Sequence, residues 1–326
     1  MKRGRSKKWL DWRGNIAWQC DALTREMTPP IPLREISLRC RVKEVVFQPL
    51  LVEAGLAIDD DGFVVFVSCD EEDKQEWASA FNNATQKGRF LPGRVRFSLA
   101  HELIHTFFYD TKQQPFRNRL NETHYKEVNS LEAACNYGAS QLLLPTRQLK
   151  SDTNKRDVLT TSCVVDLARK YRVSIECLLH RMTNLEDWTP KRGLLAYVHE
   201  VGDVYRIRAI AKSASVRGLF GNLSVDSDFK VAFGKAQYEE MKQHSSGSLE
   251  YELIYPRGVE TGVAKCRLEY RRVATAPESF ILALGVVDQP RTPTRREHPT
   301  KDFLIKLRQA IKEPGVGATD LETQNK

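Results

Sequence analysis

Two histidines and one glutamate interrupt an apolar run, "LAHELIHTFF", at residues 99–108. His101 and His105 are four residues apart, and on a helix that spacing puts both imidazoles on one face, close enough to bind a single metal ion. Neutral imidazole is a good zinc ligand. Glu102 adjoins the first histidine, where it can take a proton from the attacking water. The pattern therefore predicts a hydrolytic zinc site.

The apolar setting favours a metal site over a core helix that carries polar residues by accident. Burying two imidazoles and a carboxylate is costly unless each finds a partner, and a metal satisfies all three, directly or through its water. The motif alone occurs by chance in about one chain in a hundred of this length, so this setting matters. Ser98 is expected to cap a helix that begins at Leu99.

A catalytic zinc site has three protein ligands, so a second element must supply one more. Glu132, in a helix expected over residues 129–144, is the preferred candidate, because Asn136 lies one turn further along the same face. From there Asn136 can hydrogen-bond a ligating histidine and fix its orientation. Glu127 is the second choice. The alternative for Glu132 is a solvated helix carboxylate.

Residues close to these motifs have open interpretations. His124 is a candidate donor to the developing oxyanion, as are Tyr125 and Tyr109. A surface-loop histidine without a role is the more common case. Cys135 invites interpretation as a metal-binding thiolate, but a small buried residue that fills a helix contact is far more common.

The remaining segments predict further helices, one internal strand and a β-rich end. A helix is expected over residues 31–55 and a strand over residues 62–68. Two short amphipathic helices, "CVVDLARKY" and "SIECLLHRMTNL", are joined by a tight turn and have the length of a helix-turn-helix. Its second helix offers only His180 and Arg181 for contacts to bases or phosphates, so packing or docking is favoured over DNA reading.

Bulk properties set the class of protein and its surroundings. The net charge of +8 leaves nucleic acid or an acidic partner open, beside a protein that is simply basic. Seven scattered cysteines without a C-x-x-C pair argue against disulfides and against a cysteine-built zinc site, and favour a cytoplasmic setting. No window approaches the roughly 18 apolar residues that a membrane span requires.

Three segments together resemble the ImmA/IrrE-type metallopeptidases: "VRFSLAHELIH", "EAACNYGASQLLLP" and "LARKYRVSIECLLHRM". The resemblance covers roughly residues 35–185. It implies zinc bound by His101, His105 and Glu132, with Glu102 as the general base. Zinc is the expected ion, and manganese is the alternative, since imidazole and carboxylate ligands suit several metals.

The chain departs from the family pattern next to the predicted ligands. Ile104 stands where the family has glycine, and Cys135 and Gly138 stand where it has alanine and phenylalanine. These differences are expected to change helix packing and to leave the metal ligands intact.

The expected fold is α+β. A basic N-terminal arm (1–29) precedes a mainly helical zincin-like peptidase domain with a small sheet (30–150). A helix-turn-helix-like segment (155–188), a β-rich α+β C-terminal domain (192–312) and a disordered tail (313–326) follow.

The expected function is a zinc-dependent endopeptidase that cleaves a protein, such as a DNA-binding transcriptional repressor. The alternative is a non-catalytic, metal-stabilised regulator that binds DNA or a partner protein through the helix-turn-helix-like segment and the basic arm. An intact Glu102 favours the enzyme, because a scaffold needs the ligands but not the base.

Overall fold

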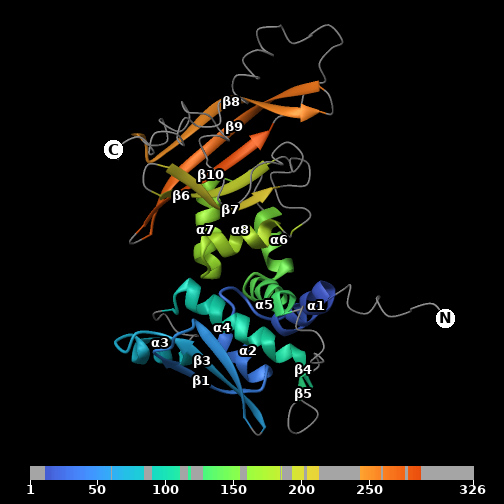
Figure 1. The fold of residues 1–326 in the computed structure, drawn as a ribbon, viewed down its shortest axis with the longest axis vertical. Coiled ribbons are helices and arrows are strands. Elements are labelled where there is room, and N and C mark those ends of the chain that lie inside the picture. The colour runs from blue at the N-terminus through green and yellow to red at the C-terminus, as the bar shows by residue number, and fades with distance from the viewer. Residues whose placement is uncertain are drawn as a thin grey trace, which may run out of the picture.

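A computed structural model represents the protein. It describes residues 12–59, 61–83, 90–110, 117–118, 128–154, 160–183, 185, 193–201, 204–212, 243–257, 260–275 and 278–287. Within these ranges the architecture is mixed α+β, as expected. A helical lower body carries a small sheet, and a larger sheet lies at the opposite end (Figure 1).

The small sheet supports the helix of the metal motif. Its strands are β1 (Val42–Gln48), β2 (Ala54–Asp59) and β3 (Gly62–Ser68), in the order β1-β3-β2. The expected strand over residues 62–68 is therefore confirmed. It pairs parallel to β1 and antiparallel to β2, and its side chains Phe63, Val65 and Val67 are buried.

Two expectations for the N-terminal part are wrong. Residues 12–24 belong to a helix, α1 (Trp12–Thr24), whose Ile16 and Cys20 are buried, so this stretch packs as core and not as a solvated arm. The helix expected over residues 31–55 is only α2 (Leu33–Arg39). Arg41 follows it with a φ of 60°, which ends the helix, and the β-branched run after it forms β1.

The metal-motif helix begins earlier than expected. After α3 (Lys74–Asn82), α4 spans Gly93–His105 and starts behind Pro92, whose extended backbone (ψ 148°) precedes the first turn. Ser98 therefore lies inside the helix, and its hydroxyl donates to Glu53 Oε2 at 3.1 Å. A short 3-10 turn, Thr106–Phe108, and a two-stranded ribbon, β4 (Tyr109–Asp110) with β5 (Arg117–Asn118), follow.

Helix α5 (Val128–Leu143) confirms the helix expected over residues 129–144 and packs directly against α4 and α1. Two of the three departures from the family pattern, Ile104 and Gly138, meet at this contact. A Cβ on Gly138 would come within 2.7 Å of Ile104 Cγ2 and 2.8 Å of its Cγ1. Ile104 is fully buried, so the space that a side chain at 138 would need is filled from α4.

Three helices connect α5 to the C-terminal sheet. Helix α6 (Thr146–Asn154), which the sequence did not suggest, is followed by α7 (Thr161–Tyr171) and α8 (Ile175–Thr183), which confirm the two short helices. Thr160 caps α7 by accepting from the Cys163 N–H, and Arg172 ends it in the left-handed conformation. Helices α7 and α8 lie between the lower body and the large sheet (Figure 1).

The C-terminal sheet is antiparallel, with strands in the order β7-β6-β10-β9-β8. Their bounds are β6 (Gly193–Val201), β7 (Val204–Lys212), β8 (Ser246–Arg257), β9 (Glu260–Thr275) and β10 (Glu278–Val287). Glu269 of β9 accepts from the Thr161 backbone N–H at 2.9 Å and from its hydroxyl at 2.6 Å. This carboxylate sits at the start of α7 and ties the sheet to that helix. The expected tail over residues 313–326 lies outside the described residues.

A buried cation joins α8 to the metal-site half of the protein. The side chain of Arg181 is 1% exposed and donates to Leu144 O, Gln141 Oε1 and Thr146 Oγ1. Burial lowers the pKa of this guanidinium. Arg181 was one of two candidates for contacting nucleic acid, and its burial removes it from that role.

No helix among the described residues is long and apolar enough to cross a bilayer. Among the cysteines whose side chains the structure describes, none takes part in a disulfide: Cys20, Cys40, Cys69, Cys135, Cys163 and Cys177.

Gly138→Ala should destabilise the protein even though alanine is the better helix former, because the methyl group overlaps Ile104. The expected loss in the free energy of unfolding is about 1–3 kcal/mol, measured by urea denaturation. Ile104→Ala in the same chain should recover part of it, so that the double variant loses less than the two single variants together. Gly55→Ala, whose added Cβ meets nothing within 4 Å, is the control. Strict additivity of the two changes would contradict the proposed overlap.

Arg181→Met should lower the free energy of unfolding by roughly 3 kcal/mol, since the Leu144 carbonyl and the Thr146 hydroxyl lose this donor and Gln141 Oε1 keeps only the hydrogen bond from Thr146. Arg169→Met, at an exposed position of α7 whose contact to Asp166 is 3.9 Å long, should stay within about 0.5 kcal/mol. Equal effects of the two substitutions in urea denaturation would show that the buried contacts of Arg181 contribute nothing special.

Candidate metal centre

The crossing of α4 and α5 brings the two histidines of the motif to a shared point. Their Nε2 atoms are 3.1 Å apart, and the rings are inclined by 62° with centroids 4.9 Å apart. Two nitrogens bound to one tetrahedral zinc at 2.0–2.1 Å would be separated by about 3.3 Å. The observed spacing therefore fits a shared ion with little movement of either side chain.

Glu132 of α5 reaches the same point from the facing helix. Its carboxylate oxygens lie 3.0 Å from His101 Nε2 and 3.6 Å from His105 Nε2. The side chain is 48% exposed, so the carboxylate keeps contact with solvent while it faces the histidines. A carboxylate beside two imidazole nitrogens is a donor set that suits zinc.

Asn136 lies one helical turn beyond Glu132 and contacts the outer side of the first histidine. Its Oδ1 is 3.0 Å from His101 Nδ1. In this geometry the Nδ1–H donates to the amide oxygen, which leaves the Nε2 lone pair directed at the shared point. The contact is the one that the spacing of Glu132 and Asn136 predicted.

Glu102 is buried in α4 beside these groups. Burial, and to a smaller degree the charge of Glu132, raises the pKa of its carboxyl to about 7. A carboxyl with a pKa near neutrality can both accept and return a proton. Burial and the neighbouring His101 lower the pKa of His105, which favours the neutral imidazole that metal binding needs.

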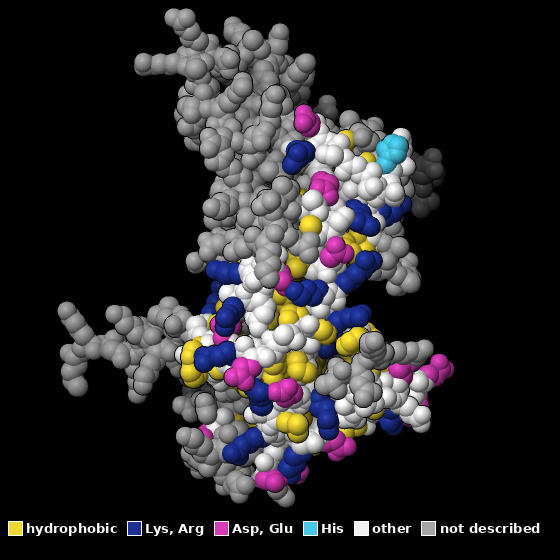
Figure 2. Space-filling model, turned by 180° about the vertical axis from the view of Figure 1, so that it is seen from behind, with side chains coloured by type: hydrophobic (Ala, Val, Ile, Leu, Met, Phe, Trp, Pro, Cys, Tyr) yellow, Lys and Arg dark blue, Asp and Glu magenta, His cyan; other side chains and the backbone are white. Residues whose placement is uncertain are grey.

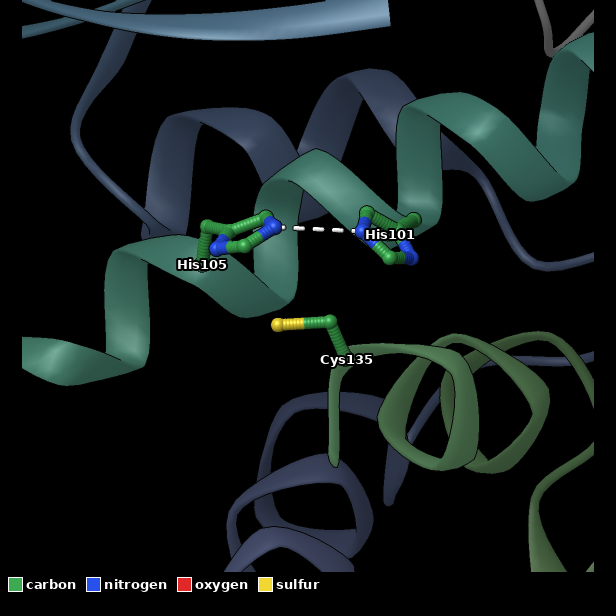
Figure 3. A group of neighbouring side chains, drawn as sticks. All are labelled: His101, His105 and Cys135. Carbon is green, nitrogen blue, oxygen red and sulfur yellow. Dashed lines mark hydrogen bonds between the residues drawn. The ribbon is translucent and has the colours of Figure 1, made fainter. Parts of the chain in front are cut away.

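Cys135 of α5 approaches the two histidines from the buried side of the site. Its sulfur and the ligating nitrogens of His101 and His105 lie within 4.8 Å of one another, and its side chain points toward the two rings (Figure 3). Burial raises the pKa of this thiol, and the nearby Glu132 and Glu102 carboxylates add to the effect. Cys135 thus lies with His101 and His105 in a group of side chains that could hold a metal ion.

Glu53 was not singled out from the sequence. It lies just before β2, receives hydrogen bonds from Arg94 and Ser98 of α4, and holds the sheet against the start of that helix. The hydrogen bond from Arg94 is the main cause that lowers the pKa of Glu53, and the charge of His101 contributes. Nothing in the sequence around Glu53 signals this contact, because it depends on a packing 41 residues away in the chain.

Other candidates from the sequence lie elsewhere. His124, Tyr125 and Glu127 fall outside the described residues. Tyr109 packs edge-on against Phe63 of β3, with ring centroids 5.5 Å apart, and burial raises the pKa of its hydroxyl.

The family comparison falls on this part of the chain. Residues 89–183 match the model of the IrrE N-terminal-like domain, Peptidase_M78. This segment is a member of the ImmA/IrrE family. The IrrE-like segment contains α4, α5 and the α7–α8 pair, and therefore both histidines, Glu102, Glu132 and Cys135.

Curated proteins and solved structures were also compared with the chain. No curated protein matches the chain. Among solved structures, the chain is similar to a Mycobacterium tuberculosis transcriptional regulator at 13% identity and a TM-score of 0.45, over 94% of this chain and 81% of that chain. A likeness at this level says nothing of what this chain does.

Glu132→Ala should lower zinc affinity at least about tenfold, since loss of even an outer partner of a metal ligand costs 10–100-fold. The measurement is competition with a chromophoric chelator on the purified chain. Glu127→Ala, the second choice from the sequence, is the matched control and should bind as the unchanged chain does. If Glu127→Ala weakens binding and Glu132→Ala does not, the assignment of Glu132 is wrong.

Proposed function

We propose that the chain is a zinc-dependent endopeptidase. The observation that carries this proposal is the convergence of His101 Nε2, His105 Nε2 and the Glu132 carboxylate beside a buried Glu102. The family match over residues 89–183 supports it independently of the distances. Zinc is the expected ion, and manganese is the alternative.

Each side chain has a distinct task in this proposal. Zinc held by His101, His105 and Glu132 would supply Lewis acidity, which polarises the scissile carbonyl and favours ionisation of water. Glu102 accepts the proton of the attacking water and delivers it to the leaving amine. Asn136 holds the His101 ring so that Nδ1 carries the proton and Nε2 is free to bind.

The proposed substrate is a protein, such as a DNA-binding transcriptional repressor. This part of the proposal rests on the resemblance to the ImmA/IrrE family. On the face shown in Figure 2, the described Lys and Arg side chains are interspersed with Asp and Glu and form no continuous basic patch. A protein substrate is therefore favoured over direct DNA binding.

The alternative function is a metal-stabilised regulator without catalysis, and Cys135 is the observation that favours it. A fourth protein donor would make the centre resemble a structural zinc site. DNA reading by α8 has less support, because Arg181 is buried in hydrogen bonds to α5 and the turn that follows it.

Glu102→Gln separates the two functions. The substitution removes the base but no ligand, so the variant should still bind about one zinc per chain while cleavage is lost. The unchanged chain and the variant are expressed at equal levels in the organism that carries the gene, and new protein N-termini are compared by mass spectrometry.

We expect new N-termini in one or a few proteins with the unchanged chain and none with Glu102→Gln. Glu72→Gln, at an exposed position of the loop before α3, is the matched control and should cleave normally. Equal biological effect of the unchanged chain and Glu102→Gln, with no cleavage in either, would reject the peptidase and favour the regulator.

A further inference from the structure

Cys135 and Glu132 are three residues apart on α5 and therefore share one face of the helix. Both face the histidine pair of α4. Cys135 is fully buried, whereas the Glu132 side chain is 48% exposed, so the sulfur approaches from the protein side and the carboxylate from the solvent side. Figure 3 shows the sulfur directed at the space beside the two rings.

Donors from both sides approach the same two imidazoles: the Cys135 sulfur lies within 4.8 Å of their ligating nitrogens, and the Glu132 oxygens lie 3.0 Å from His101 Nε2 and 3.6 Å from His105 Nε2. In a tetrahedral site with Zn–N near 2.0–2.1 Å and Zn–S near 2.3 Å, a nitrogen and a sulfur ligand are about 3.6 Å apart. The sulfur and both nitrogens already lie within 4.8 Å of one another. Bringing the sulfur and the two nitrogens to that spacing therefore requires them to approach by at most about 1.2 Å, within the reach of a side-chain torsion.

A second buried cysteine, Cys20, provides a comparison, because its thiol is hydrogen-bonded to a backbone carbonyl and is not grouped with the histidine nitrogens. Cys20 of α1 is also fully buried, and its S–H donates to Gly138 O, on α5, at 3.6 Å. Cys20 thus has a carbonyl partner, while Cys135, one turn away from Gly138 on α5, lies among imidazole nitrogens. The two cysteines form a matched pair for comparison.

We propose that Cys135 is the fourth metal donor and that the resting centre, His101–His105–Glu132–Cys135, has no open position. This inference rests on the proposed metal site. Binding converts the thiol to a thiolate, and its proton passes to solvent. A catalytic zinc centre keeps one position open, so the chain becomes competent for hydrolysis only when the Cys135 sulfur leaves the metal.

The soft sulfur also sets the metal preference. Thiolate selects zinc over manganese, which prefers carboxylate, carbonyl and water oxygens. With Cys135 as a donor, zinc rather than manganese is the resident ion. Without it, the His101–His105–Glu132 set would discriminate less between the two.

Cobalt(II) in place of zinc reports both the donor and the open position. The full chain is stripped of metal and titrated with Co(II), first alone and then with azide, an anion that binds open metal positions. We expect the unchanged chain to show a thiolate-to-cobalt charge-transfer band in the near ultraviolet and no change in its visible d–d bands on adding azide.

Cys135→Ala should still bind Co(II), but with an affinity lowered by more than about tenfold, without the charge-transfer band, and with d–d bands that shift with azide. Cys20→Ala is the control and should behave as the unchanged chain does.

If the unchanged chain gives a tetrahedral Co(II) spectrum in the visible region without the charge-transfer band, and responds to azide, the role of Cys135 is overturned while the metal site stands. Failure of the unchanged chain to bind Co(II) and zinc would overturn the metal site and this inference together.

Discussion

The close packing of α4 on α5 is the contact on which the site depends. It places His101 and His105 opposite Glu132 and Cys135, with no loop residue involved among the described donors. Helices are rigid elements, so the relative positions of the donor atoms follow from the distance and the angle between the axes of α4 and α5. Ile104 and Gly138 fill the centre of that crossing, which makes their pairing a determinant of donor geometry as well as of stability.

The same contact buries ionisable groups that a cation would stabilise. The charge of Glu132 adds to the raised pKa of Glu102, and the two imidazole Nε2 atoms are 3.1 Å apart, where one can donate a hydrogen bond to the other. Desolvation adds to the difficulty, as the raised pKa of Glu102 and the lowered pKa of His105 show. A divalent ion would offset the cost of burying these carboxylates and imidazoles. Metal binding and the stability of the α4–α5 pair are therefore expected to be linked.

Much of the site could be predicted because its signals are local. The spacing of His101 and His105, and of Glu132 and Asn136, is set by one helix each, and helical periodicity carries over into space. The helices α5, α7 and α8, the strand β3 and the β-rich character of the C-terminal part were also expected from their patterns. The strand at residues 42–48 and helix α1 were missed, because helix ends depend on a single backbone angle, as at Arg41, and the burial of α1 depends on α5.

Cys135 could not be assigned from the sequence for a different reason. Its spacing from Glu132 places it on the right face of α5, but many residues on that face only pack. Whether its sulfur reaches the two histidines depends on how closely α4 and α5 pack. That distance depends on the contact between Ile104 and Gly138, which belong to two motifs far apart in the sequence. Glu53 and Arg181 are similar cases, since their partners lie far away in the chain.

The segment that carries the family likeness is not a self-sufficient folding unit. Its helix α4 rests on α2 and the small sheet, its α5 on α1, and its α8 on β7. The apolar core runs without interruption from Ile16 to Leu284. An excised fragment of residues 89–183 would expose the apolar faces of three helices, α4, α5 and α8, to water. The histidine motif therefore belongs to a larger apolar body, and any shortened version for crystallisation or expression has to keep both flanking sheets.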